Sequence, residues 1–248
     1  MQLYYIRHAQ SANNALYIET GSEIGRHHDP PLSEKGVRQL PYLAALIAGG
    51  NPDAPAPRND PANRRGFGLT HLYTSLMERA IQTASAIAAA TKLSLEGWID
   101  VHEHGGIFEV DEATQTRRGL PGPGRSELAS RFPHLLLPDD LPEEGWWNRP
   151  YEEEDALFVR AQRFLADLLA RHGGSDDRVA VVSHAGFYRA VLRALLGFST
   201  AYPHESDGQL PVYFGLNNTG ITRIDFYEDR RAIVYLNRLD HLPDELIT

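Results

Sequence analysis

Two short apolar runs constrain the fold of this 248-residue chain more than any other feature. Residues 3–6 (LYYI) and residues 179–182 (VAVV) are apolar or aromatic throughout, and each run is followed within two positions by a histidine, His8 or His184. Short continuous apolar runs bordered by helical patterns are typical of strands that are buried on both faces of a parallel sheet. The sequence therefore predicts an α/β protein with both runs in its central sheet.

Further strands and helices alternate along the chain. Helical spacing of apolar residues and β-branched runs predict the following elements: a strand at 69–75, helices at 77–92, 152–172 and 187–196, and an antiparallel hairpin formed by 221–227 and 232–236. This order favours a three-layer α/β/α sandwich with a mostly parallel central sheet, formed as a single domain over residues 1–248.

Three stretches fit the alternation less well. A helix capped by Ser33 is predicted over 33–47, but Pro41 lies inside it and should kink or shorten it. Proline and glycine are frequent in 49–68 and 105–150, so both are predicted to be insertion-like loops without regular elements. We expect the second to form a small cap over the active site.

Composition excludes several classes of function. The chain has no cysteine, which removes disulfide frameworks, thiolate metal sites and cysteine nucleophiles. A net charge of −9 excludes the broad basic surface of a nucleic-acid-binding protein, and no apolar stretch approaches the ~18 residues of a membrane span. No charged leader precedes the first strand, so we expect a cytoplasmic protein without nucleic-acid or membrane partners. The sequence leaves the oligomeric state open.

Two histidines follow strands that should end at the same edge of the sheet. Ligands of open parallel sheets bind at this edge, beyond the carboxyl ends of the strands. His8 is preceded by Arg7, and Arg79 is expected in the first turn after the 69–75 strand. Guanidinium groups hold phosphate oxygens, and a neutral imidazole can attack phosphorus. The combination with His184 therefore indicates phosphoryl chemistry.

Four segments resemble a known family. Residues 7–14 (RHAQSANN) resemble the R-H-G-E-S-x-x-N signature of the phosphoglycerate mutase-like proteins of the histidine phosphatase superfamily, with Ala9 and Gln10 in place of the usual Gly and Glu. The other three segments follow in the family's order: 29–36 (DPPLSEKG) with Gln39 after it, 73–84 (YTSLMERAIQTA) and 182–186 (VSHAG). The matching segments are scattered along most of the chain, and only the two predicted insertions lack a clear counterpart.

The resemblance implies roles for individual residues. It makes His8 the nucleophile that becomes phosphorylated and places Arg7, Arg79 and His184 around the phosphate, with Asn14 in support. His184 is expected to act as a cationic donor to the transferred group. The resemblance implies no cofactor and no metal.

The proton donor is implied by a further segment. Residues 101–109 (VHEHGGIFE) are similar to the family's L-x-E-x-x-x-G segment, which makes Glu103 the expected proton donor and leaves Glu109 as its rival. A donor at this position would protonate the leaving alkoxide and then activate water against the phosphohistidine.

The expected function is a metal-independent phosphomonoester hydrolase that acts on a small phosphorylated metabolite through a phosphohistidine. A phosphoglycerate mutase using the same histidine is the alternative, although the mutases' W-R-R segment has no counterpart here, because no tryptophan precedes Arg117 and Arg118. A catalytically silent phospho-ligand binder or scaffold is the second alternative. Arg117, Arg118 and Arg125 are candidate contacts to a second anionic group of the substrate.

Two histidine-containing clusters and a tryptophan pair are the remaining local patterns. The clusters at 102–104 (HEH) and 27–29 (HHD) hold ligand-type residues but match no zinc spacing, so no metal site is predicted. The pair Trp146 and Trp147 is expected to pack beneath the cap.

Overall fold

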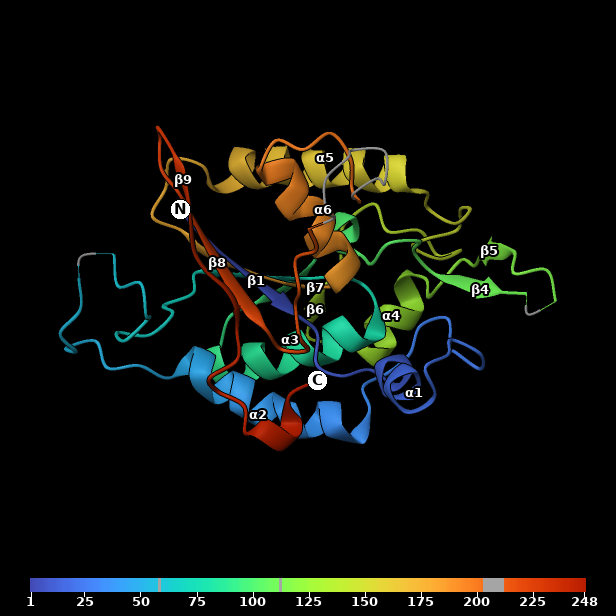
Figure 1. Ribbon diagram of the computed structural model, residues 1–248, viewed down its shortest axis with the longest axis horizontal. Helices are drawn as coiled ribbons and strands as arrows, with labels where there is room; N and C mark the ends of the chain where they lie inside the picture. The colour runs from blue at the N-terminus through green and yellow to red at the C-terminus, as the bar shows by residue number, and fades with distance from the viewer. Residues whose placement is uncertain (58, 112, 203–211) are drawn as a thin grey trace.

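A seven-stranded sheet forms the centre of the molecule in this computed structural model, which describes residues 1–57, 59–111, 113–202 and 212–248 (Figure 1). The strand order is β6-β3-β2-β7-β1-β8-β9. The first five strands in this order are parallel, whereas β8 and β9 are antiparallel. The strands are β1 (Gln2–Arg7), β2 (His71–Thr74), β3 (Leu95–Gly97), β6 (Leu135–Leu136), β7 (Arg178–Ser183), β8 (Ile221–Phe226) and β9 (Arg231–Arg238).

The apolar run of β1 divides its side chains between two cores. Leu3 and Tyr5 pack into one cluster, and Tyr4 and Ile6 pack into the other. Successive side chains of a strand point to opposite faces, so a strand covered on both faces must be apolar at every position. This requirement explains why both runs read as unbroken hydrophobic segments.

Helices cover both faces of the sheet. Helices α5 (Glu154–His172) and α6 (Ala185–Leu195) lie on one face, and α2 (Glu34–Ala48) and α3 (Glu78–Thr91) lie on the other (Figure 1). The predicted three-layer α/β/α architecture and its mostly parallel sheet are thereby confirmed.

The effect expected of Pro41 on the predicted 33–47 helix is partly wrong. Ser33 caps α2 as predicted, accepting from the Gly36 N–H at 3.0 Å, but the helix runs to Ala48 and is not shortened. Proline removes the bond to the carbonyl of residue i−4, here Val37. Val37 and Pro41 are both exposed, so water can satisfy this carbonyl.

The expectation that 105–150 lacks regular elements is wrong. This stretch contains a hairpin of β4 (Phe108–Val110) and β5 (Arg117–Gly119), helix α4 (Arg125–Arg131), and β6, which forms an edge of the main sheet. Its glycines allow close backbone approach: a Cβ at Gly119 would lie 1.9 Å from the carbonyl oxygen of Arg149. The glycine content that suggested a loop therefore reflects close packing of backbone segments.

The other predicted insertion, 49–68, has no helix or strand among its described residues. Its second half is held by specific contacts. Asn63 Nδ2 donates to the Tyr4 hydroxyl at 2.8 Å. Phe67 is buried, and the centroid of its ring lies 5.1 Å from that of Tyr4. The Arg223 guanidinium donates to two carbonyls in this segment.

Helix α1 (Ala12–Thr20) was not predicted from the sequence. It has no buried residue and therefore no apolar stripe that could show in the pattern. Short 3-10 turns at Ile99–Val101 and Asp244–Leu246 complete the regular elements named here. In the ranges that the structure describes, no helix combines the length and apolarity that a bilayer crossing requires.

Candidate active site

His8 and His184 meet at the carboxyl edge of the sheet, although 175 residues separate them in the chain. His8 follows β1, His184 follows β7, and these neighbouring parallel strands pair residue Arg7 with Ser183. The two imidazole rings lie with their centroids 5.0 Å apart. The predicted convergence of the two histidines is confirmed.

The hydrogen bonds of His8 assign its tautomer. Nδ1 lies 2.7 Å from the Ala9 carbonyl oxygen, which can only accept, so Nδ1 carries the proton. The other nitrogen, Nε2, accepts from Arg79 Nε at 3.2 Å. Burial, with the charges of Arg79 and Arg7, holds the pKa of His8 well below its ordinary value. His8 is therefore neutral, with the lone pair on Nε2.

Arg79 is fixed in the first turn of α3 by a buried carboxylate. Its Nη1 lies 3.5 Å from Asp29 Oδ1, and Asp29 also accepts from the backbone N–H of Glu78. Burial raises the pKa of Asp29 to about 6 although the adjacent arginine opposes the shift. Asp29 belongs to a segment that the sequence comparison singled out without assigning it a role; here it orients Arg79.

Arg7 approaches from the end of β1. Its Nη1 donates to the Leu216 carbonyl at 2.7 Å, while its Nε is buried and finds no hydrogen-bond partner in the described part of the chain. Burial lowers the pKa of Arg7 to about 10, with Glu103 opposing, so the group stays charged at neutral pH. An unpartnered buried donor beside His8 is suited to an anion.

His184 lies behind His8 and does not line the cavity surface. It is fully buried at the start of α6, where Nε2 is 2.9 Å from the Ser75 hydroxyl and Nδ1 has no hydrogen-bond partner within the described ranges. Burial, with Arg79 and His8, holds the pKa of His184 well below its ordinary value. In the ligand-free protein His184 is therefore neutral, and its role as a cationic donor to a bound phosphoryl group stays a prediction.

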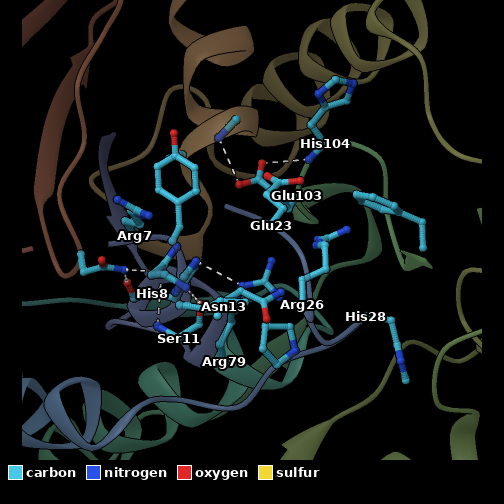
Figure 2. Close-up of a pocket in the computed structure, with 18 of the residues that line it drawn as sticks. Arg7, His8, Ser11, Asn13, Glu23, Arg26, His28, Arg79, Glu103 and His104 are labelled. Carbon is cyan, nitrogen blue, oxygen red and sulfur yellow. Dashed lines mark hydrogen bonds between the residues drawn. The ribbon is translucent and has the colours of Figure 1, made fainter. Parts of the chain in front are cut away.

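Glu103 lines the cavity, whereas Glu109 does not. The Glu103 carboxylate accepts from the backbone N–H groups of His104 at 2.8 Å and Gly186 at 3.2 Å (Figure 2). It also accepts from the backbone N–H of Phe187 at 3.0 Å. The last two belong to the first turn of α6, whose dipole favours an anion. Glu109 is exposed on the β4–β5 hairpin and pairs with Arg118. Position therefore separates the two candidate carboxylates.

Asn14 lines the cavity from α1 and also braces it. Its Oδ1 accepts from the Ser11 N–H at 3.2 Å and from Asn218 Nδ2 at 3.1 Å. Asn218 in turn donates to the His8 carbonyl at 2.9 Å. The loop that carries His8 is thereby tied to a second segment about 200 residues away.

The cavity has a volume of about 640 Å³ and a positively charged lining. Five arginines and two glutamates face it: Arg7, Arg26, Arg79, Arg117, Arg189, Glu23 and Glu103. The protein as a whole carries −9, so the cavity's charge opposes that of the molecule. Such a site attracts anions.

Sequence reasoning missed Arg26 and Arg189, and of its three candidates for a second anion contact only Arg117 lines the cavity. Arg118 pairs with Glu109 on the hairpin, and Arg125 donates to the carbonyls of Pro138 and Leu141. These two predictions are wrong, because hairpin and loop contacts already use both guanidinium groups.

The tryptophan pair packs as predicted. Trp146 and Trp147 are 3% and 4% exposed and belong to the core on the α2 and α3 side of the sheet. The Trp147 ring occupies the space beside Gly106, where a Cβ would lie 2.2 Å from the indole.

One group of side chains in the described ranges has metal-ligand spacing, and sequence reasoning did not identify it: His71, His172 and Asp177. It lies at the edge of the sheet opposite His8, because β2 begins at His71. Both ring nitrogens of His172 already have partners, at 3.2 Å from the Tyr73 hydroxyl and 2.9 Å from Asp177 Oδ2. These bonds explain the group without an ion.

Comparison with known families gives a match over most of the chain. The pattern of the histidine phosphatase superfamily (branch 1) matches residues 61–239. The chain belongs to the histidine phosphatase superfamily. The matched region holds Arg79, Glu103 and His184, while Arg7 and His8 precede it. The family predicted from the sequence is confirmed, and with it the phosphatase class of enzyme.

Solved structures share the fold at low sequence identity. A phosphoserine phosphatase from Entamoeba histolytica in complex with 3-phosphoglyceric acid is 21% identical, with a TM-score of 0.57 and coverage of 98% of this chain and 99% of the other. A mycobacterial glucosyl-3-phosphoglycerate phosphatase with VO3 is 19% identical (TM-score 0.57; coverage 95% and 98%). A putative alpha-ribazole-5'-P phosphatase from Escherichia coli is 18% identical (TM-score 0.54; coverage 96% and 97%). No curated protein sequence matches the chain.

Proposed function

We propose that this protein hydrolyses a small phosphomonoester through a phosphohistidine at Nε2 of His8. The observation that carries the proposal is the state of that nitrogen. Nε2 has no proton, because the proton of the ring is on Nδ1, which donates to the Ala9 carbonyl. Nε2 instead accepts a hydrogen bond from the buried Arg79 guanidinium. A neutral imidazole with a fixed lone pair beside two arginines is suited to in-line attack on phosphorus.

The first step forms the bond between His8 Nε2 and phosphorus and breaks the bond to the leaving oxygen. Substrate entry must displace the hydrogen bond from Arg79 Nε, which then turns to a phosphoryl oxygen. Arg7 contributes its unpartnered Nε–H to the same group. The two guanidiniums neutralise the charge on the equatorial oxygens.

Glu103 donates a proton to the leaving alkoxide. It must enter this step protonated, although in the free protein it accepts three backbone N–H bonds. As a carboxylate it then takes a proton from water, which attacks phosphorus and releases phosphate and free His8. His184 supplies a Nδ1–H donor from behind His8, and a bound phosphate dianion favours its protonation. Asn14 supports the phosphate pocket from α1.

The names of the structural neighbours support a small phosphorylated metabolite as the substrate, since they include phosphatases of phosphoserine and glucosyl-3-phosphoglycerate. The cytoplasmic location, the absence of a nucleic-acid partner and the single-domain organisation remain predictions from the sequence.

The decisive experiment is phosphate release from p-nitrophenyl phosphate in EDTA by the wild type and by His8→Ala. We expect metal-independent turnover that the substitution abolishes, and an acid-labile, alkali-stable phosphoryl group on the wild type after rapid quenching. Turnover that survives His8→Ala, or that EDTA removes, would overturn the mechanism.

The mutase alternative uses the same histidine and is separated by its product. Incubation with 3-phosphoglycerate and a trace of 2,3-bisphosphoglycerate yields inorganic phosphate if the protein is a phosphatase, and 2-phosphoglycerate if it is a mutase. The first result is expected.

A further inference from the structure

The cavity holds more positive charge than a transferred phosphoryl group requires. Arg7 and Arg79 flank His8 and match the two charges of a phosphomonoester. Two further arginines, Arg26 and Arg117, line the part of the cavity formed by the loop after α1 and by β5. In the view of Figure 2, Arg26 lies on the side of His8 opposite Arg7.

Arg26 has a buried N–H donor that could bind an anion in the cavity. Its Nη1 is buried and has no hydrogen-bond partner among the residues that the structure describes. Its guanidinium lies over the Phe108 ring, 4.1 Å from the centroid. Burial lowers the pKa of Arg26 and Glu23 opposes the shift, but no salt bridge involves Arg26 within the described ranges. A buried donor without a partner is unfavourable until a ligand satisfies it.

Arg117 lies over an aromatic ring in the same way as Arg26. Its guanidinium lies 4.7 Å from the centroid of Tyr151, and its Nη1 donates to the Tyr151 hydroxyl at 3.0 Å. Phe108 and Tyr151 pack edge to face with centroids 4.8 Å apart, so two adjoining rings hold the two cations near each other. Nη1 of Arg26 and the donors of Arg117 other than Nη1 can then bind one planar or tetrahedral anion.

We propose that Arg26 and Arg117 form a second anion site, and that the substrate is a phosphomonoester whose leaving group carries a further anionic group. The proposal rests on the proposed function for the position of the phosphoryl group. Arg7 and Arg79 account for the phosphoryl dianion, and three further arginines, Arg26, Arg117 and Arg189, line the cavity. A carboxylate or a second phosphate on the leaving group fits the pair Arg26 and Arg117.

The test compares substrates that differ only in the second group. Phosphoserine and phosphoethanolamine differ by a carboxylate, and propane-1,3-diol bisphosphate and 3-hydroxypropyl phosphate differ by a phosphate. We expect kcat/KM to favour the anionic member of at least one pair by tenfold or more, and that pair identifies the group. Arg26→Gln and Arg117→Gln should each reduce this preference to threefold or less, while Arg26→Lys retains part of it. Arg118→Gln, next to Arg117 but paired with Glu109, is the matched control and should leave the preference intact.

Equal kcat/KM within both pairs, or a preference that Arg26→Gln leaves unchanged, would overturn the second anion site. The same pairs are titrated calorimetrically into His8→Ala, because binding needs no turnover. Tighter binding of the anionic member supports the site even if no substrate is hydrolysed, and equal dissociation constants overturn it. Failure of hydrolysis by the wild type counts against the proposed function alone.

Discussion

Arg79 Nε lies 3.2 Å from Nε2 of His8 and donates to the nitrogen that the proposed mechanism uses for attack. The free protein thus holds its nucleophile as a hydrogen-bond acceptor, with Nδ1 fixed on Ala9. A protonated imidazole has no lone pair on Nε2 and could not accept this bond. The contact therefore agrees with the low pKa of the buried His8, which keeps the ring neutral.

Glu103→Gln should affect substrates according to their leaving groups. The amide can still accept from the α6 N–H groups but cannot donate a carboxyl proton or activate water. For alkyl phosphates we expect kcat to fall by ~10²–10⁴-fold. For p-nitrophenyl phosphate, whose leaving group needs no proton, we expect a burst of about one equivalent per site followed by slow turnover. Stopped-flow absorbance measures both phases. Glu109→Gln is the control, and an equal loss there would reject the assignment.

Gly186→Ala should reduce activity with little effect on stability. A Cβ at this helical position would lie 2.4 Å from Glu103 Oε1, the mobile end of a side chain, so the carboxylate must move. We expect kcat/KM to fall by roughly 10²-fold, the size of a general acid's contribution. The melting temperature should change by less than about 2 °C, which corresponds to about 1 kcal/mol or less for a chain of this size.

The control for that substitution is Gly215→Ala, since no atom of the described residues lies within 4 Å of its added Cβ. Kinetics and thermal unfolding of the two variants are measured together. If Gly186→Ala is as active as Gly215→Ala, Glu103 does not act from the position seen here.

Asp29→Asn should change the pH profile as well as the rate. Asp29 holds Arg79, and its pKa of about 6 means that the wild type loses this anchor as the pH falls through 6. We expect kcat/KM of the variant to be lower by roughly tenfold at pH 7.5, from misplacement of the guanidinium. The acid limb near pH 6 should also flatten relative to the wild type on the same substrate. A variant whose profile keeps the wild-type limb would show that Asp29 has only a structural role.

Acid should destabilise the fold below pH 6.5. His8, His102 and His184 are buried with pKa values well below the ordinary value, mainly through desolvation. Between pH 6.5 and their folded pKa values the unfolded chain binds protons that the native protein does not. Stability is therefore full above pH 6.5 and falls by about 1.4 kcal/mol per histidine per pH unit below it.

Asp29 contributes with the opposite sign, because its raised pKa lets the native state bind a proton between about pH 6 and 4. Three histidines outweigh one carboxyl, so urea midpoints should decrease steadily from pH 7.5 to 5. Midpoints that stay constant or increase over this range would contradict the buried neutral histidines.

The strands and the main site residues could be predicted because their signals are local. A strand covered on both faces must be apolar at every position, and a polar pair such as Arg7 and His8 directly after it marks the end of the strand. Parallel pairing then brings His184 to the same edge without further information. The layer architecture follows from the same alternation.

Arg26 could not be found in this way. It lies in a loop, and its role depends on Phe108, which a three-residue strand of the β4–β5 hairpin brings beneath it. The loop and the three-residue strand are both too short to show a periodic pattern of apolar residues in the sequence. Asp29 lies in the recognised 29–36 motif, but only the tertiary contact with Arg79 shows what its carboxylate does.

The meeting of β1, β2 and β7 at the candidate site has a consequence for the dynamics of the sheet. His8, Ser75 and His184 follow three adjacent parallel strands, so an anion held there depends on all three keeping their register. Binding and cooperative opening of the sheet are then thermodynamically linked: a ligand at a hundred times its dissociation constant adds about 2.7 kcal/mol to the cost of opening. Slowed amide exchange at Tyr4 and Val181, in the middle of the protein, would report occupancy of a site at its edge.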